Sequence, residues 1–230
     1  MLSASAERIR RSLSDADVVL DVGGWAVPYP RADWVIDLMP YESRGAYGRI
    51  GDEPERFTPR TWVERDLCER EPWPFDDGQF DFAVCAQTLE DVRDPVWVCA
   101  ELNRVARAGY VEVPSRLEEQ CVGVHGPWAG YSHHHWLVDV GERQVDFVFK
   151  SHVVHSRDEF HFPAGFADSL EPQERVQQLW WEGGFDFAER ILIDTEEHDR
   201  YLASFVAANR DRASSPRRSL GSRLRPGRRL

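Results

Sequence analysis

The sequence predicts an α/β fold: a doubly wound, mostly parallel sheet with a late antiparallel strand and an added β-hairpin. The first observation is the stretch 79–115, which reads as a buried strand, a polar turn, a helix and a second buried strand. The second is a pair of earlier apolar runs of strand length, 18–22 and 33–38. The third is the segment 131–150, where two strand-like runs flank the turn 141–143 as in a hairpin.

The stretch 79–115 is the clearest of these elements. Its helix carries apolar residues at three- and four-residue steps, at Val96, Val98, Leu102 and Val105. Two buried strands joined by one helix usually pair in parallel through a right-handed crossover, and ligands then bind at the carboxyl ends of the strands. Those ends carry Ala86, Gln87, Glu90 and Asp91 after the first strand, and Pro114 and Ser115 after the second.

The other elements are predicted from shorter patterns. Residues 6–13 are expected to form a short amphipathic helix, and 62–67 a short strand. Residues 172–181 are expected to be helical. The alternating run 185–193 is expected to form the late strand, and 198–212 a final helix.

The composition favours one globular domain. The chain has 230 residues, is 42% hydrophobic and contains nine Trp and twelve Phe, which suffices for a core. We expect one domain over 1–209, with a core at 18–115 and substrate-side additions at 116–209, and then a disordered Arg-rich tail at 210–230. The tail holds eight Arg and one Asp, so the rest of the chain carries −12 − 7 = −19. Such an acidic body argues against a general nucleic-acid-binding surface.

The cysteines and the apolar runs bear on the location of the protein. Cys68, Cys85, Cys99 and Cys121 show no close paired spacing, which is typical of a reduced cytosolic protein. No apolar run approaches the ~20 residues of a membrane span, and the first residues lack the apolar core of a secretory signal. We therefore expect a cytoplasmic protein without a membrane span.

A candidate binding loop follows the apolar run 18–22. Asp21, Gly23 and Gly24 lie at its carboxyl end, where the backbone can come close to a ligand because glycine has no Cβ. Asp37 ends the next predicted strand in the same way. A carboxylate there can accept two charge-assisted hydrogen bonds from the vicinal hydroxyls of a ribose. The two strand ends therefore predict a ligand site at this edge of the sheet.

These features resemble a known family. The Leu-Glu pair at 89–90 and the Val-Pro pair at 113–114 are similar to the ends of the fourth and fifth strands in class I S-adenosylmethionine-dependent methyltransferases, closest to the type 11 variant. The resemblance covers 18–115 and implies a Rossmann-like fold with S-adenosylmethionine as the cofactor. The chain diverges from the family pattern in a shortened glycine loop, where Pro28 and Pro30 exclude the usual long helix.

The resemblance also implies roles for individual residues. In that family the loop after the first strand cradles the methionine part of the cofactor, and an acidic residue after the second strand binds the ribose. An Asp after the third strand contacts the adenine amino group, and the residue after it packs on the ring. The cofactor residues implied here are Asp21, Gly23, Gly24, Asp37, Leu38, Asp66, Leu67, Cys85 and Gln87.

A nicotinamide cofactor is an alternative, because NAD-binding folds also place a carboxylate on the ribose. In those folds the carboxylate follows the glycine loop by roughly 20 residues, and the loop reads G-x-G-x-x-G. Here the step from Gly23 to Asp37 is 14 residues, and the glycine motif is missing. Both facts disfavour NAD.

Three consecutive histidines are the main catalytic candidates. On the predicted strand 131–140, His133 and His135 would share one face, and His134 would point to the other. An imidazole can remove a proton from an acceptor hydroxyl, and two on one face can bind a divalent metal, so both uses stay open. Glu90, which starts the loop after the 80–85 strand, competes for the role of base.

The leading hypothesis is a methyltransferase that uses S-adenosylmethionine and acts on a small-molecule acceptor, with a sugar or glycan hydroxyl as the first candidate. One alternative is a methyltransferase-like binding or accessory protein without catalysis, suggested by the shortened glycine loop. A NAD-dependent oxidoreductase is the weaker alternative. A divalent metal has no support from ligand spacing, and the sequence leaves the oligomeric state open.

Overall fold

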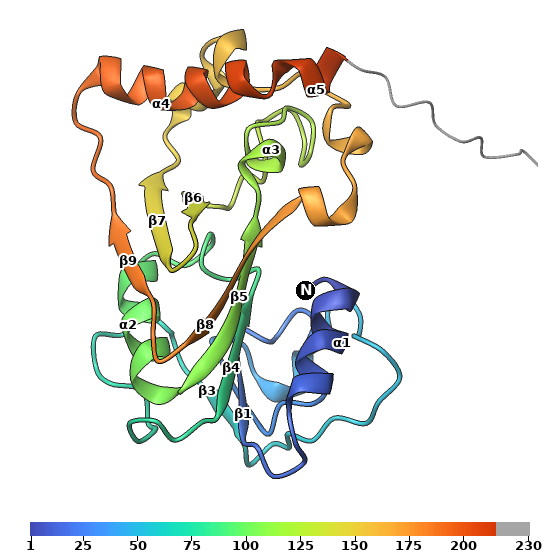
Figure 1. Ribbon diagram of the computed structural model, residues 1–230. Coiled ribbons are helices and arrows are strands. Elements are labelled where there is room, and N and C mark those ends of the chain that lie inside the picture. Colours follow the sequence, from blue (N-terminus) through green and yellow to red (C-terminus); the bar gives the residue numbers. More distant parts are fainter. Residues whose placement is uncertain (215–230) are drawn as a thin grey trace, which may run out of the picture.

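A computed structural model describes residues 1–214 as two parts stacked on one another (Figure 1). The lower part is a six-stranded sheet in the order β3-β2-β1-β4-β5-β8, and the upper part contains a three-stranded sheet in the order β6-β7-β9. The larger sheet consists of β1 (Val19–Val22), β2 (Trp34–Asp37), β3 (Trp62–Glu64), β4 (Phe82–Ala86), β5 (Ala108–Pro114) and β8 (Val176–Glu182). The smaller sheet consists of β6 (Trp136–Val140), β7 (Gln144–Phe149) and β9 (Asp186–Glu189).

The predicted strand, helix, strand unit is confirmed. Strands β4 and β5 pair in parallel with Val84 opposite Tyr110, and they are joined by helix α2 (Pro95–Val105). The helix begins where the Asp94 side chain accepts a hydrogen bond from the Trp97 N–H and Pro95 occupies the first turn. Strands β1, β2 and β3 continue the parallel pairing, so the mostly parallel α/β sheet is also confirmed.

Each face of the larger sheet is covered by one helix (Figure 1). Helix α1 (Ser3–Ser12) packs through Ala6 and Ile9 on one face, and α2 covers the other. In the described chain, no α-helix connects β1 to β2, β2 to β3 or β3 to β4; the one helical turn there is η1 (Tyr41–Ser43). Aromatic residues fill the space that helices usually cover: Tyr29, Phe57 and Trp62 of β3 on the α1 face, Trp73 and Phe75 on the α2 face.

The late part of the sheet differs from the prediction. The antiparallel strand at its edge is β8, which pairs with β5, whereas 172–181 was expected to be helical. Only the short turn η5 (Pro172–Glu174) is helical there. Leu179 and Trp181 join the core on one face and Trp180 packs on the other, which is strand alternation. The predicted late strand 185–193 supplies β9 instead, which pairs in parallel with β7 in the smaller sheet.

The predicted hairpin is confirmed, but its first strand is shorter than expected. Strands β6 and β7 pair antiparallel, and the Gly141 N–H donates to the Gln144 carbonyl across the turn. Strand β6 begins at Trp136 rather than Tyr131, because the N–H groups of His135 and Trp136 donate to the Glu90 carbonyl instead of a strand partner.

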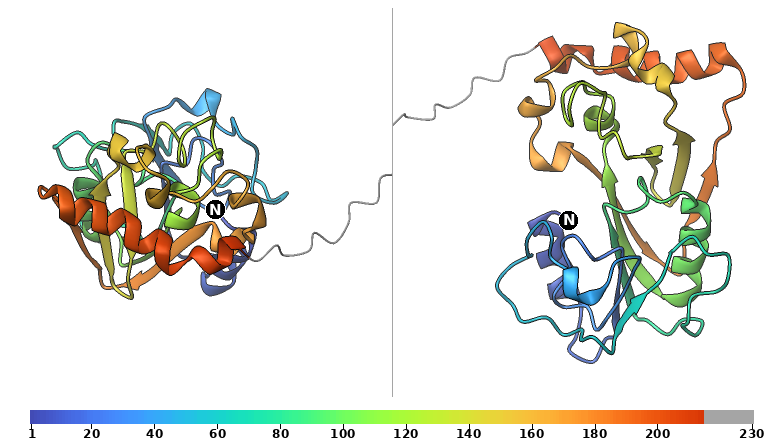
Figure 2. Two further views of the ribbon diagram at one scale, coloured as in Figure 1. Left: turned by 90° about the horizontal axis from the view of Figure 1, so that it is seen from above. Right: turned by 180° about the vertical axis from the view of Figure 1, so that it is seen from behind.

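Helix α4 (Thr195–Ala208) lies across the top of the molecule, with α3 (Arg116–Glu119) beneath it (Figure 2). Residues 210–214 of the segment predicted as a disordered tail form the short helix α5 (Arg210–Ser214), and the rest of that segment lies outside the described residues. Short helical turns η2 (His152–His155), η3 (Asp158–Phe160) and η4 (Ala167–Ser169) pack with α4 through Val154, Phe160 and Ala167. The four cysteines are buried and free. Among the helices of residues 1–214, none has the length and apolarity to cross a membrane.

Candidate functional site

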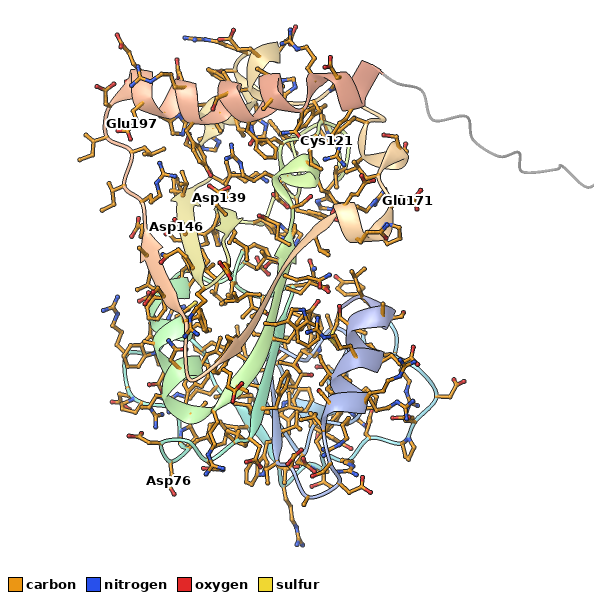
Figure 3. The ribbon with its side chains drawn as sticks, in the orientation of Figure 1. Asp76, Cys121, Asp139, Asp146, Glu171 and Glu197 are labelled. Carbon is orange, nitrogen blue, oxygen red and sulfur yellow. The ribbon has the colours of Figure 1, made fainter. Side chains whose placement is uncertain are left out.

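The carboxyl ends of β1, β2, β4 and β5 form the upper edge of the large sheet, beneath α3 and the β6–β7 hairpin (Figure 1). Asp139 of β6 lies above this edge, whereas Asp76 lies at the opposite end of the molecule, below α2 (Figure 3). The residues predicted to bind a cofactor and those predicted to act as bases come from both sides of this edge. They form two groups, one around Asp21 and one around His134.

The first group surrounds a small cavity of about 70 Å³ at the ends of β1 and β4. Three residues predicted for the methionine part of the cofactor, Asp21, Gly23 and Gly24, all line it. Gln87, predicted from the end of β4, also lines it. The other residues around the cavity are Met1, Ala26, Val27, Tyr29, Ile50, Val84 and Ala86.

Asp21 is the buried acid of this cavity. Its Oδ2 accepts a hydrogen bond from the Tyr29 N–H at 2.8 Å, and Oδ1 has no partner within the described chain. Burial raises the pKa of Asp21 to about 7, against the opposing effect of the Tyr29 N–H, and the nearby charge of Asp37 raises it further. A methyl group at Gly24 would lie 2.3 Å from Asp21 Oδ2, so the loop can turn over this carboxyl only as glycine. The cavity therefore holds a carboxyl that a cationic ligand would ionise.

Gln87 holds an uncommon backbone conformation. Its φ is +56°, a value rare for a residue with a side chain, and its N–H donates to the Glu112 carbonyl at 2.8 Å. The Gln87 side chain is exposed beside the cavity and donates to Glu112 Oε1 at 3.2 Å. Strained conformations of this kind concentrate at ligand sites.

The predicted ribose and adenine contacts already have protein partners. Asp37 accepts hydrogen bonds from the N–H groups of Trp25 and Met39, and burial raises its pKa. Burial would also raise the pKa of Asp66, but the Cys68 N–H and the Arg93 guanidinium, 2.7 Å away, outweigh it and hold that pKa below its usual value. Each carboxylate oxygen can accept a further bond, so a nucleoside would add to these contacts.

The three apolar cofactor candidates lie in different surroundings. Leu38 is 60% exposed, beside Asp37 at the end of β2, and is free to contact a ligand ring. Leu67 and Cys85 belong to the main hydrophobic core under the sheet. Burial raises the pKa of the Cys85 thiol well above its usual value. Neither of these two residues lines the cavity.

The second group is built on the histidines, and the predicted strand alternation there is wrong. Residues 131–135 precede β6 and are not in a strand. His134, which was ranked behind its neighbours, is the one that turns inward: its Nδ1 lies 2.7 Å from Glu119 Oε1, and its side chain is 8% exposed. His133 and His135 are both exposed.

Glu119 fixes this arrangement from α3. Its second oxygen, Oε2, lies 2.6 Å from Lys150 Nζ, and Lys150 also donates to the Tyr131 carbonyl. Gly130 has φ +62°, and a side chain there would lie 2.6 Å from Glu119 Oε2, so glycine is required where the loop crosses α3. With Nδ1 bonded to the carboxylate, His134 carries its proton on that nitrogen, and Nε2 is left as an acceptor.

Glu119 and Lys150 were not predicted as site residues, although each has a recognisable feature in the sequence. Glu119 belongs to an acidic pair directly after the second strand of the 79–115 unit, at the edge where ligands bind. Lys150 is the only lysine in a chain rich in arginine. A single lysine that is almost fully buried beside a glutamate is typical of a site in which its charge is needed.

Glu90, the competing base, lies between the two groups. It is 1% exposed, and its Oε2 has no hydrogen-bond partner within the described residues. Burial raises its pKa well above the usual value, and the charges of Glu119 and Asp91 raise it further. A carboxyl with a raised pKa holds its proton to higher pH, which favours a role as a hydrogen-bond donor over a role as a base.

Glu90→Gln is expected to make folding more stable at pH 8 and to change it little at pH 5. The raised pKa means that the folded state of the wild type keeps the proton, so wild-type stability falls as pH rises above the unfolded value of about 4.5. Glutamine has no charge to bury, so this loss disappears. Urea unfolding at both pH values measures the difference, with exposed Asp91→Asn as the matched control. A variant that is less stable at pH 8 would contradict the neutral state of Glu90.

Within residues 1–214, no group of three or more His, Cys, Asp or Glu side chains is arranged to hold a metal ion. The histidines instead contact one another and Tyr131 as rings. The His134 and Tyr131 rings lie 4.6 Å apart, and His133 meets both of them edge-on. Burial, and then the neighbouring His134, lower the pKa of His133.

One family model matches part of the larger sheet. Residues 34–111, which run from β2 into β5, match the family model described as a methyltransferase domain. A comparison with curated proteins found no match.

Solved structures show similar chains at low identity. A chain of the complex between the Haloferax volcanii Trm112 methyltransferase activator and a methyltransferase is 16% identical, with a TM-score of 0.34 over 49% of this chain and 57% of that one. The YcgJ protein of Bacillus subtilis is 16% identical, with a TM-score of 0.35 over 50% of this chain and 52% of its own. For a SAM-dependent methyltransferase of Aquifex aeolicus the identity is 22% and the TM-score 0.37, over 55% and 72%. The first two matches span little more than half of the length of those proteins. At this similarity, the substrate of this chain does not follow from the substrates of these three proteins.

Proposed function

We propose that this chain, a member of the class I S-adenosylmethionine-dependent methyltransferases, transfers a methyl group from S-adenosylmethionine to a hydroxyl of a small molecule. The observation that carries the proposal is the pairing of His134 with Glu119 of α3, which lies above the carboxyl edge of the sheet, together with the cavity at Asp21 on that edge. One group is suited to hold the cofactor and the other to remove a proton.

The residues around the cavity fit the methionine end of the cofactor. The cofactor carries an ammonium, and Asp21 offers an unpartnered oxygen to such a group. Asp37 and exposed Leu38 lie on the side where the nucleoside would extend. The cavity itself is smaller than the whole cofactor, and Met1 lines it, so binding of the whole molecule requires the first residues to shift.

The chemistry assigned to the chain's own residues is positioning and proton removal. When bound, S-adenosylmethionine supplies a methyl group already activated by its sulfonium. His134 Nε2 takes the proton from the acceptor hydroxyl as its oxygen attacks, and Glu119 stabilises the imidazolium that results. Lys150 holds Glu119 in place and balances its charge. The remaining rate enhancement comes from alignment of the acceptor oxygen with the methyl group.

The acceptor proposed is a sugar or glycan hydroxyl. The rings of Tyr131, His125 and His133 cluster around His134, and Trp128 is 50% exposed nearby on the same loop, against His155. Flat rings of this kind stack on the apolar face of a sugar while a base addresses one hydroxyl.

Calorimetric titration tests the proposal. We expect S-adenosylmethionine and S-adenosylhomocysteine to bind and NAD to have no effect. Absence of binding of both sulfur ligands would reject the proposal, and binding of NAD alone would favour the oxidoreductase. If the cofactor binds and a panel of small hydroxyl compounds gives no S-adenosylhomocysteine, the accessory-protein alternative gains support.

A further inference from the structure

The segment that leads from β9 to α4 forms an exposed edge on the outer side of the smaller sheet. In the sheet order β6-β7-β9, strand β9 is an edge strand. The chain then continues as a coil along the margin of the molecule, with no other segment on its outer side (Figures 1 and 2). Ile191 is 71% exposed and Ile193 88% exposed, the latter the most exposed large apolar side chain of residues 1–214.

The backbone of this edge is open to another strand. The N–H of Arg190 donates to the Phe147 carbonyl of β7, and the N–H of Asp186 donates to the Arg143 carbonyl in the turn before β7. In an extended chain, the backbone groups of residues 189, 191 and 193 then point away from the sheet. In the described chain, the N–H groups of Ile191 and Ile193 have no hydrogen-bond partner. An apolar strand edge with free backbone groups is a template for pairing with a further strand.

The exposed side chains continue into a groove. A cavity of about 380 Å³ lies between the end of β7, the turn η2 and this segment. Phe149, 57% exposed, and Val153, 36% exposed, line it together with Ile191 and Ile193. An apolar surface of this extent on a sheet edge marks an interaction site.

The sequence of the edge is complementary to itself. Read from Arg190 to Asp194 it is Arg-Ile-Leu-Ile-Asp, which is symmetric about Leu192 except that the two ends carry opposite charges. Antiparallel pairing of two copies, centred on Leu192, would set Ile191 opposite Ile193 and Arg190 opposite Asp194.

The backbone directions agree with this register. Residues 191 and 193 both point their N–H and C=O groups outward, so they would form the hydrogen-bonded pair. Residues 190 and 194 would then form the closer, non-hydrogen-bonded pair, which suits an ion pair. Asp194 uses only Oδ1 to cap α4, which leaves Oδ2 without a partner in the described chain.

We propose that the edge 189–194 is a dimer interface, on which a second copy of this chain pairs antiparallel about a two-fold axis at Leu192. The pairing then spans residues 190–194 of each copy, because β9 ends at Glu189 and α4 begins at Thr195. The contact follows the symmetry of most homodimers, since the same patch serves both copies. It is small relative to stable interfaces, so the dimer forms reversibly at moderate concentration.

Sedimentation of two matched double variants tests both the dimer and its register. Ile191→Lys with Ile193→Lys sets like charges opposite each other in both cross-strand pairs. Ile191→Lys with Ile193→Glu sets opposite charges there, and only in the antiparallel register centred on Leu192. Both positions are exposed, so the fold of the monomer is not expected to change.

We expect the wild type to show a monomer–dimer equilibrium between about 10 µM and 1 mM. The Lys/Lys variant should associate at least about tenfold more weakly, and the Lys/Glu variant should remain a dimer. A wild type that stays monomeric over this range would overturn the proposal. So would a Lys/Lys variant that dimerises like the wild type, or a Lys/Glu variant as monomeric as Lys/Lys.

Discussion

Replacing His134 with glutamine is expected to lower the rate of methyl transfer by roughly 10²- to 10⁴-fold, the usual effect of removing a general base. Glutamine can still donate to Glu119 from a similar position, but it cannot accept the proton of the acceptor hydroxyl. Cofactor affinity should stay unchanged, because His134 lies with α3 and the hairpin rather than at the cavity around Asp21. The loss therefore falls on turnover alone.

The measurement is single-turnover release of S-adenosylhomocysteine with an acceptor found by the hydroxyl screen. His135→Gln is the matched control, because His135 is exposed and contacts Glu90 through its backbone N–H alone. Glu119→Gln tests the positioning role: it keeps a hydrogen-bond acceptor for Nδ1 but loses the charge, so a smaller loss is expected. If His134→Gln turns over at the wild-type rate, or if only His133→Gln is inactive, the assignment of the base is wrong.

The conformation of the histidines was predicted wrongly because it depends on tertiary contacts rather than on the local sequence. From the sequence, His133 to His135 were placed on a strand, where alternation would separate His134 from its neighbours. In the structure, the carbonyl of Glu90 accepts the N–H groups of His135 and Trp136, so strand β6 begins only after the histidines. The partners of His134 lie 15 residues away at Glu119 and, through it, at Lys150. No local pattern contains those pairings.

The strands also divide into those that the local sequence predicts and one that depends on tertiary pairing. Strands β1, β2, β4 and β5 were predictable, because strands buried on both faces are short continuous apolar runs ending in polar or glycine residues. Strand β8 was predicted as a helix because its glutamines and glutamates suit either structure. What decides it is the edge of β5, with which all seven residues of β8 pair. The cofactor candidates Asp21, Gly23, Gly24 and Gln87 were brought together as predicted, since parallel strands end at one edge.

Asp21→Asn is expected to weaken cofactor binding at pH 7 by about 1.5–3 kcal/mol, the value of a hydrogen bond between charged groups. It should also remove the pH dependence of that binding. In the free protein, burial raises the pKa of Asp21 to about 7. Ionised Asp21 attracts the ammonium of the cofactor, whereas the protonated form does not. Wild-type affinity should therefore rise about tenfold for each pH unit between pH 5 and 6.5, while the variant's stays flat.

Calorimetry across this range measures both slopes, with Asp76→Asn at the opposite end of the molecule as the control (Figure 3). A flat wild-type profile would show that Asp21 does not face the ammonium.

The stability of the Asp21→Asn variant shows whether weaker binding comes from a lost contact or from a less stable fold. Since the folded pKa of about 7 lies above the usual 3.8, ionising Asp21 costs stability as pH rises between these values. Asp21→Asn removes that cost, and its amide oxygen can still accept the Tyr29 N–H. The variant should thus be more stable than the wild type at pH 8 by roughly 2–4 kcal/mol. If Asp21→Asn binds the cofactor more weakly and is also more stable, the Asp21 carboxylate serves binding and lowers the stability of the fold.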